Sequence, residues 1–440
     1  DQEKINNFTE TINLVKKINN RHENLFILYS QRAKLKEAQE DYKDALSDYN
    51  IAIQLNNNNT DLFLDRAKLK LKLDDIKGAI KDINNSIEIN DLNIKSYLLR
   101  AEINAKNGKE EATYNDIEKI IKLNNEKGTY ELITSDINYQ LGQIFEYLKD
   151  YEAAEKEYSK VIKKRKASLL DNNTGNLDKN KRTDNQLKEK GEVIINELLP
   201  NQKLAYWGRA IARKKLNKLS DAILDYKKVL EMDPKNISAL ENLCNLIQQE
   251  GNYNEALKYF NKLIELVSNN GYYYSKRAYQ KILLNDNKGA IEDLNKAIEI
   301  EPKNSINFYN RGLAKSNLDN YKNAIEDYSI AIELDPEYAI SYANRGYAKG
   351  SLGDFEGAIE DYNIALDIKK NFIGAFINRA WNKYKIDDLE GAIRDSNKVL
   401  TLEENNKYAL NTRGLAKYKL GDLKSGCIDL KRASNLDLGE

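Results

Sequence analysis

Nine arginines in the sequence each precede an aspartate by sixteen residues. The pairs are Arg32/Asp48, Arg66/Asp82, Arg100/Asp116, Arg209/Asp225, Arg277/Asp293, Arg311/Asp327, Arg345/Asp361, Arg379/Asp395 and Arg413/Asp429. A guanidinium presents planar donors that match a carboxylate, so each pair predicts a charge-assisted contact and could form a bidentate fork. Shared descent from a duplicated unit explains the recurrence equally well, and both explanations stay open here. In either case the pairs indicate architecture rather than catalysis.

Other residue types that could support catalysis are scarce. His22, the single histidine, lies in the polar stretch KKINNRHEN and is interpreted as a solvated surface residue. Cys244 and Cys427 lie far apart and are expected to be small buried residues rather than a disulfide. No CxxC or His-rich metal spacing, GxxxxGK phosphate loop or GxSxG nucleophile elbow occurs. The sequence therefore predicts no enzyme, no metal site and no cofactor.

The elements that must position the Arg/Asp pairs recur every 34 residues. The stretch NRGLAKSNLDNYKNAIEDYSIAI at 310–332 returns as NRGYAKGSLGDFEGAIEDYNIAL at 344–366. The four prolines, from Pro200 to Pro336, are separated by 34 or by twice 34 residues. A fixed period of this length is typical of a solenoid, in which each repeat packs on its neighbours. Such a chain reaches 440 residues without a single large core.

One repeat, 305–338, predicts two helices. Residues 306–318 carry apolar and small side chains at helical spacing, DN at 319–320 marks a turn, and residues 321–334 show a second helical pattern. Pro336 prevents the second helix from continuing. Each repeat is therefore predicted to be an antiparallel helix pair, which must stack on other pairs to bury its apolar face.

Two positions of the repeat stay small almost throughout. The eighth is Ala33, Ala67, Ala101, Gly142, Ala210, Cys244, Ala278, Gly312, Gly346, Ala380 and Gly414. The twentieth is Ala45, Ala79, Thr113, Ala154, Ala222, Ala256, Ala290, Ala324, Ala358, Ala392 and Gly426. Small side chains at fixed places predict that neighbouring helices approach closely. A leucine there would overpack the contact, at a cost of about 1–3 kcal/mol.

These features resemble the tetratricopeptide repeat. The shared pattern is a small eighth residue, G-[DN]-[YF] near positions 15 to 17, alanine at 20, an aromatic at 24, a small residue at 27 and often proline at 32. This sequence departs from it with arginine rather than leucine at position 7, and mostly lysine rather than tyrosine at position 11. The resemblance covers nearly the whole chain. It implies an all-α fold, a right-handed superhelical solenoid of antiparallel helix pairs.

The repeat frame also predicts how the chain is divided. The predicted parts are a partial leading repeat or helix (1–25), a four-repeat N-terminal array (26–168) with an insertion (128–134), a degenerate repeat (169–202) and a seven-repeat C-terminal array (203–440). Phe8 is assigned to position 17 of the leading repeat. The degenerate repeat carries a polar, turn-rich stretch at 169–184. We expect this loop to weaken the stack and to divide the array in two.

In the family that the sequence resembles, positions 2, 5, 6, 9, 12 and 13 of each repeat face a concave groove. Position 6 of the last six repeats carries Asn242, Lys276, Asn310, Asn344, Asn378 and Thr412. This row resembles an asparagine ladder, whose amides both donate to and accept from the backbone of an extended peptide. Positions 9 and 12 supply the aromatic residues Tyr279, Tyr347, Trp381, Tyr384 and Tyr418, which suit interface anchors. The alternatives are solvated asparagines and rings that pack on adjacent helices.

Together these residues predict a non-catalytic scaffold for protein–protein interaction, which binds an extended peptide or a protein surface mainly in repeats 237–440. The alternative is an accessory region of a larger enzyme or assembly complex whose catalytic part lies outside this chain. A chaperone C-terminal tail is not expected as the partner, because no lysine occupies position 5. Lys+Arg and Asp+Glu balance at 69 each, which argues against a nucleic-acid partner.

The start of the sequence and its hydropathy bear on where the protein acts. The start, DQEKINNF, has neither Met nor an apolar signal segment, so we expect a processed or truncated chain. No run approaches the ~18 apolar residues that a membrane helix needs. The expectation is a soluble chain, either cytoplasmic or in a processed secreted or periplasmic form.

Overall fold

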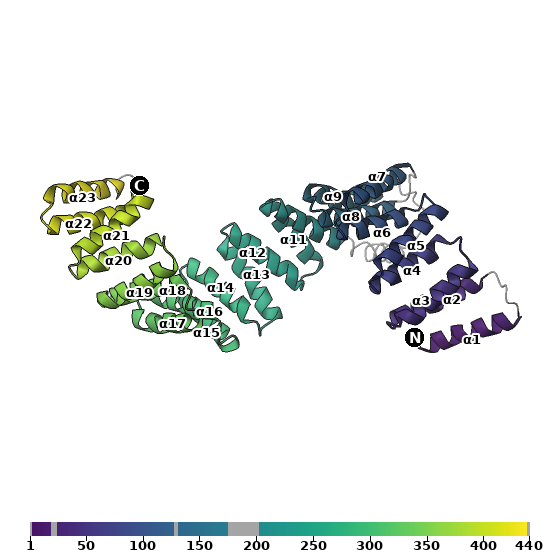
Figure 1. Ribbon diagram of the computed structural model, residues 1–440, viewed down its shortest axis with the longest axis horizontal. Coiled ribbons are helices and arrows are strands. Elements are labelled where there is room, and N and C mark those ends of the chain that lie inside the picture. Colours follow the sequence, from purple (N-terminus) through teal and green to yellow (C-terminus); the bar gives the residue numbers. More distant parts are fainter. Residues whose placement is uncertain (1, 19–23, 127–130, 175–201, 438–440) are drawn as a thin grey trace. The chain divides into compact units, whose positions relative to one another are not determined.

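The computed structural model describes residues 2–18, 24–126, 131–174 and 202–437, and all regular secondary structure in these ranges is α-helix (Figure 1). The first compact unit, Asp1–Pro234, contains α1 (Gln2–Ile18), α2 (Leu25–Ala38), α3 (Tyr42–Leu55), α4 (Thr60–Lys72), α5 (Ile76–Ile89), α6 (Ile94–Lys106), α7 (Glu110–Glu126), α8 (Glu131–Tyr147), α9 (Tyr151–Thr174), a helix over 202–215 and α11 (Leu219–Met232). The second unit, Lys235–Glu440, contains α12 (Ile237–Gln249), α13 (Tyr253–Leu266), α14 (Gly271–Leu283), α15 (Asn287–Ile300), α16 (Ser305–Ser316), α17 (Tyr321–Leu334), α18 (Ala339–Ser351), α19 (Phe355–Ile368), α20 (Ile373–Lys385), α21 (Leu389–Leu402), α22 (Lys407–Lys419) and α23 (Leu423–Asp437).

The helices pair consecutively within each repeat, as the sequence predicts. In repeat 305–338 the two predicted helices are α16 and α17, and α17 ends two residues before Pro336. Within each unit every pair packs on the next one along the chain, for example α17 on α18 and α21 on α22. The predicted all-α array of stacked helix pairs is confirmed.

The turn between the two helices of a pair depends on a left-handed residue at position 15. The residues with positive φ there are Glu40, Asp74, Gly108, Lys149, Asn217, Gly251, Asn285, Asp319, Gly353, Asp387 and Gly421. Glycine adopts this conformation without a steric cost, which explains the glycine of the repeat pattern. The next residue is an N-cap: Asp75 accepts from the Gly78 N–H at 2.8 Å and Asp354 from the Gly357 N–H at 3.0 Å. The G-[DN] signature therefore ends one helix and begins the next.

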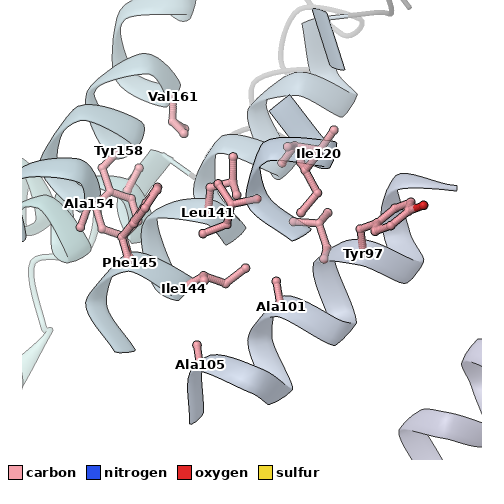
Figure 2. Close-up of a cluster of buried hydrophobic side chains, with 14 of the residues drawn as sticks. Tyr97, Ala101, Ala105, Ile120, Leu141, Ile144, Phe145, Ala154, Tyr158 and Val161 are labelled. Atoms are coloured by element: carbon pink, nitrogen blue, oxygen red, sulfur yellow. The ribbon is translucent and has the colours of Figure 1, made fainter. Parts of the chain in front are cut away.

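The small residues at positions 8 and 20 lie where the two helices of a pair meet. Ala154 is fully buried, and Figure 2 shows it beside Tyr158 in the cluster between α8 and α9. A Cβ added to Gly142 would lie 2.6 Å from the Tyr158 ring, and one added to Gly312 would lie 2.8 Å from the Tyr328 ring. In these repeats the glycine at position 8 therefore makes room for the tyrosine at position 24.

All nine predicted Arg/Asp contacts form. In repeat 339–372, Arg345 donates through Nε to Asp361 Oδ2 at 3.0 Å and through Nη2 to Oδ1 at 2.7 Å, which is a bidentate fork. The other eight pairs make the same two-nitrogen contact, with Nε of Arg100 within reach of both oxygens. The aspartates are buried, so each carboxylate depends on its partners for compensation.

A second basic residue, at position 11, completes each cluster in most repeats. Asp361 also accepts from Lys349 Nζ at 2.9 Å. The equivalent contacts are Lys36/Asp48, Lys70/Asp82, Arg213/Asp225, Lys281/Asp293, Lys315/Asp327, Lys383/Asp395 and Lys417/Asp429. Arginine at 7 and lysine at 11 are the two departures from the family pattern, and they belong to one Arg–Lys–Asp cluster. The sequence prediction covered only the arginine and the aspartate.

The same arginines also connect each repeat to the preceding one. Nη1 of Arg311 donates to Asn295 Oδ1 at 2.8 Å, and Nη1 of Arg345 donates to Ser329 Oγ at 3.0 Å. Both acceptors occupy position 25 of the preceding repeat. A repeat without the arginine lacks this connection, and Leu141 and Leu243 occupy position 7 in two such repeats.

Repeat 203–236 packs directly on repeat 135–168. Nη1 of Arg209 donates to Ser159 Oγ at 3.1 Å, and Nε of Arg213 donates to Glu155 Oε1 at 2.9 Å. Ser159 is at position 25, so this is the contact that consecutive repeats make elsewhere. The stack is continuous across 169–202, which corrects the expectation that this segment divides the array. The chain instead divides into its two compact units after Pro234.

Other expected boundaries also differ from the structure. Helix α9 continues to Thr174, although a loop was expected from 169, and residues 175–201 lie outside the described ranges. Residues 131–134 of the expected insertion form the start of α8, and 128–130 are not among the described residues. Arg32 Nη1 donates to Thr9 at 3.0 Å, so Thr9 takes the place of position 25 and Phe8 that of position 24 rather than 17.

Candidate peptide-binding groove

The first helices of the second unit form a continuous face. Helix α14 packs on α16, α16 on α18, α18 on α20, and α20 on α22 (Figure 1). Residues at positions 2, 5, 6, 9, 12 and 13 of these helices include all the predicted groove residues of repeats 271–440. We refer to this side of the unit, together with the same positions of α12, as the first-helix face.

Large aromatic side chains are exposed on the first-helix face. Tyr279, Tyr347, Trp381 and Tyr418 expose 37%, 49%, 38% and 52% of their surface. Tyr384 is half-buried and stacks on Trp381 with ring centroids 5.6 Å apart. Each ring therefore keeps a free edge or face, although Trp381 is supported by its own helix. Exposed aromatic residues with rigid support are typical of interface anchors.

Lysines accompany two of these rings. Lys385 Nζ lies 4.6 Å from the centroid of the Trp381 ring, and Lys419 Nζ lies 5.7 Å from that of Tyr384. An ammonium over an aromatic face is attracted by the ring quadrupole. The C-terminal part of the first-helix face is therefore both aromatic and basic.

The predicted asparagine ladder is uneven. Asn310 exposes 6% of its surface and Thr412 exposes 4%, so these two side chains present little to a ligand. Asn242 and Asn378 are half-buried, and Asn242 Nδ2 donates to the Ser238 carbonyl at 2.9 Å. Lys276 Nζ lies over the Tyr272 ring, 5.3 Å from its centroid. The sequence alone placed all six side chains in one row, whereas the structure exposes them to different extents.

Asn344 is tied to a tyrosine cluster. Its Nδ2 donates to Tyr309 Oη at 3.2 Å, and the Tyr309 ring meets Tyr338 edge to face with centroids 5.3 Å apart. Burial raises the pKa of Tyr309 to about 12, so the phenol stays protonated at neutral pH. Because an amide has two donors and an acceptor, Asn344 retains capacity for a ligand after this bond.

A cavity of about 320 Å³ opens beside α12 and is lined by Glu241, Asn242, Asn245, Phe260, Leu263, Tyr272 and Tyr273. The Tyr273 hydroxyl donates to Glu241 Oε1 at 2.6 Å. The pKa of Tyr272 is raised, chiefly by burial and also by the negative charge of Glu241. Only Asn242 of this set was predicted, because position 5 was tested in the sequence for lysine and not for a carboxylate.

The first unit has a hollow on the equivalent side that sequence reasoning did not anticipate. It measures about 370 Å³ and is lined by Leu64, Lys68, Lys95, Leu98, Leu99, Glu102, Gln140, Gln143 and Ile144. Most of these occupy positions 2, 5, 6 and 9 of three successive repeats. The signal was present in the apolar residues at position 5, but apolar residues there are equally expected in a core.

Two sequence predictions about reactive residues have different outcomes. Cys244 is buried, and burial raises the pKa of its thiol to about 12, which makes it unreactive. Cys427 is exposed, which corrects its prediction as a buried residue, and neither forms a disulfide. His22 lies outside the described residues. Among the residues that are described, no three His, Cys, Asp or Glu side chains are grouped to hold a metal ion.

Across the described helices, none combines the length and the apolar character needed to cross a membrane.

Comparison with known proteins gives matches at the level of the repeat. Profiles described as Tetratricopeptide repeat match residues 135–163, 308–338 and 339–372, and one described as TT21 fifth ARM repeats domain matches 211–305. No curated protein matches the chain.

Several solved structures are similar. A tetratricopeptide repeat protein from Parabacteroides merdae is 18% identical over 64% of this chain and 98% of its own, with a TM-score of 0.45. Yeast Tom70 is 16% identical over 93% of this chain and 92% of its own, with a TM-score of 0.36. YrrB, described as a TPR protein with an unusual peptide-binding site, is 23% identical over 41% of this chain and 94% of its own, with a TM-score of 0.36.

Four findings indicate the same repeat family: the period of 34, the stacked helix pairs, the small residues at positions 8 and 20, and the matching repeat profiles. The chain is a tetratricopeptide repeat protein.

Proposed function

We propose that this protein is a non-catalytic scaffold that binds a partner protein through an extended segment laid along the first-helix face of repeats 237–440. Tetratricopeptide repeat proteins typically mediate protein–protein interaction. The observation that carries the proposal is the exposure of Tyr279, Tyr347, Trp381 and Tyr418 on four first helices of the second unit, α14, α18, α20 and α22. Isolated exposed apolar residues need no explanation, but large rings recurring on one face favour an interaction surface.

The half-buried amides suit recognition of a peptide backbone. Asn242, Asn344 and Asn378 are half-buried at position 6 of their first helices, and an amide can bond a peptide unit regardless of its side chain. The rings would then supply affinity and the amides would orient the segment. An extended segment also explains why no deep pocket is needed, because contacts are distributed over several repeats.

The test is a selection of displayed random dodecapeptides on the full-length chain, followed by titration of the best binders. The variant Tyr347→Ala/Trp381→Ala/Tyr418→Ala removes three exposed rings, and we expect its affinity to fall at least tenfold with an unchanged helical spectrum. A second variant, Asn242→Ala/Asn344→Ala/Asn378→Ala, tests the amides separately.

The matched control is Tyr114→Ala, which removes an equally exposed tyrosine from α7, a second helix. This control should bind like the wild type. Equal affinities of the wild type and the triple aromatic variant would contradict the proposal, and binding lost only when the 370 Å³ hollow of the first unit is altered would move the site there.

A further inference from the structure

The cavity beside α12 holds a carboxylate that lacks a basic partner. Glu241 is half-buried, and its only hydrogen bond among the described residues is the one at 2.6 Å from Tyr273. No lysine or arginine in the described ranges forms an ion pair with it. It is also the one acidic residue at position 5 of the eleven repeats, so the repeat architecture does not require it.

Two basic residues of α14, the helix that carries Tyr272 and Tyr273, have other partners. Lys276 Nζ lies over the Tyr272 ring, 5.3 Å from its centroid. Arg277 donates to Asp293 at 2.6 and 2.8 Å and to Asn261 at 2.8 Å. The buried Asp293 has two basic partners, Arg277 and Lys281, whereas Glu241 has none among the described residues. A half-buried charge without a countercharge is costly, so a ligand that brings one would be favoured.

The rest of the lining complements a cation. Tyr272 exposes 46% of its surface and presents a ring, on which a cation is attracted by the quadrupole. Asn242 and Asn245 contribute amide groups, and Phe260 and Leu263 provide an apolar wall for an alkyl chain. A carboxylate has acceptor capacity for about four hydrogen bonds, so Glu241 still has capacity after binding Tyr273.

We propose that this cavity, the Glu241 cavity, binds the side chain of a lysine or arginine in the partner segment. The proposal rests on the proposed function, because the cavity is lined by positions 5, 6 and 9 of the same face that would hold the segment. The alkyl part of the side chain packs on Phe260 and Leu263, and the ammonium or guanidinium donates to Glu241 across the Tyr272 ring. A charge-assisted bond of this kind fixes the register of an otherwise repetitive groove.

The first experiment uses peptides selected on the full-length chain and compares each basic residue with norleucine, which keeps the alkyl chain and removes the charge. On the wild type, the substitution at one position should weaken binding about tenfold, as expected for a charge-assisted hydrogen bond. On Glu241→Gln the same substitution should have no effect. Lysine and arginine peptides measured side by side decide which cation is preferred. The control Glu292→Gln alters an exposed carboxylate on α15 and should leave the wild-type pattern intact.

Peptides that lose no affinity on norleucine substitution, or that lose the same affinity on Glu241→Gln as on the wild type, would overturn the proposal.

The second experiment does not depend on a peptide. Nα-acetyl-lysine N-methylamide and its arginine analogue are titrated into the full chain labelled with ¹³C at glutamate Cδ, and the Glu241 signal is assigned by its loss in Glu241→Gln. The signal should shift with both amides and not with the norleucine analogue. If no peptide binds but this signal shifts, the proposed function is wrong and the proposed cation site in the Glu241 cavity is supported. A signal that does not shift refutes the cation site.

Discussion

The guanidinium of Arg209 donates to the hydroxyl of Ser159 at 3.1 Å, although fifty residues separate them in the chain. In seven other repeats the same contact joins residues sixteen apart, as between Arg345 and Ser329. The difference is 34 residues, the length of one whole repeat. Repeats 135–168 and 203–236 therefore pack on each other as consecutive repeats do.

Deleting residues 169–202 should leave the array intact. The deletion joins position 34 of one repeat to position 1 of the next, which is the connection that the Arg209/Ser159 contact already matches. Because the shortened connection costs less closure entropy, we expect an unchanged or slightly higher free energy of unfolding, by about 1 kcal/mol. Urea denaturation followed by circular dichroism measures it.

Deletion of repeat 305–338, also 34 residues long, is the control for that experiment. It removes a repeat that packs on both neighbours. It should therefore lower both the urea concentration at the unfolding midpoint and the slope of the free energy of unfolding against urea concentration. If the two deletions behave alike, 169–202 contributes to the stack after all.

Removing the arginine of one Arg–Lys–Asp cluster should lower the free energy of unfolding more than replacing all three residues. Arg345→Leu leaves Asp361, which is 2% exposed, with only Lys349 as a basic partner, and should cost about 3 kcal/mol. The triple variant Arg345→Leu/Lys349→Ile/Asp361→Tyr copies the residues of repeat 237–270, where these positions are Leu, Ile and Tyr. It should recover much of the loss in urea denaturation, since no buried charge remains unpaired. A triple variant as unstable as the single one would show that the cluster is needed as such.

Adding one methyl group to Gly426 should destabilise the last helix pair. A Cβ there would lie 2.9 Å from the Gly414 carbonyl oxygen and 2.9 Å from the Tyr418 nitrogen, which are backbone atoms that cannot turn away. We expect Gly426→Ala to cost about 1–3 kcal/mol in chemical denaturation, despite the higher helix propensity of alanine. Gly374→Ala is the control, because its Cβ would meet only the Phe372 ring at 3.7 Å. That change should be neutral or slightly stabilising, and a similar loss in both variants would refute the packing argument.

Glu146 should make stability depend on pH. Burial raises the pKa of its carboxyl, and the Tyr158 hydroxyl donates to it at 2.6 Å. A raised pKa means that the folded state favours the protonated form, so the contribution to stability is complete below the unfolded pKa and is lost as pH rises through the folded pKa. Glu146→Gln should therefore be more stable than the wild type at pH 7, and the difference should vanish as the pH is lowered. Thermal melts at several pH values measure this.

Glu37 provides the matched control for Glu146. It meets Tyr49 in the same repeat positions, but Lys72 Nζ lies 2.8 Å from its carboxylate. Glu37→Gln should lose this partly exposed ion pair and be neutral or slightly less stable at pH 7. A gain in stability in both variants would show that the carboxyl charge at this position is unfavourable whatever its partner.

The sequence by itself determined the repeat and most of its internal packing. The helix pairs, the small residues at positions 8 and 20 and the Arg/Asp contacts involve residues close in the chain, and they recur in many copies. Each repeat contacts only its neighbours, so a regular pattern in the sequence translates directly into a regular stack. The family was predictable for the same reason.

Only the tertiary structure decided which repeats are neighbours and which groove residues are exposed. The contact between Arg209 and Ser159 could not be inferred, because sequence order places another repeat between them. Asn310 and Asn344 share one repeat position, yet Asn310 is buried and Asn344 is not. The Glu241 cavity likewise depends on side chains from three helices, α12, α13 and α14. Exposure and cavities are set by the residues that adjacent helices bring together, and a repeat position alone does not contain that information.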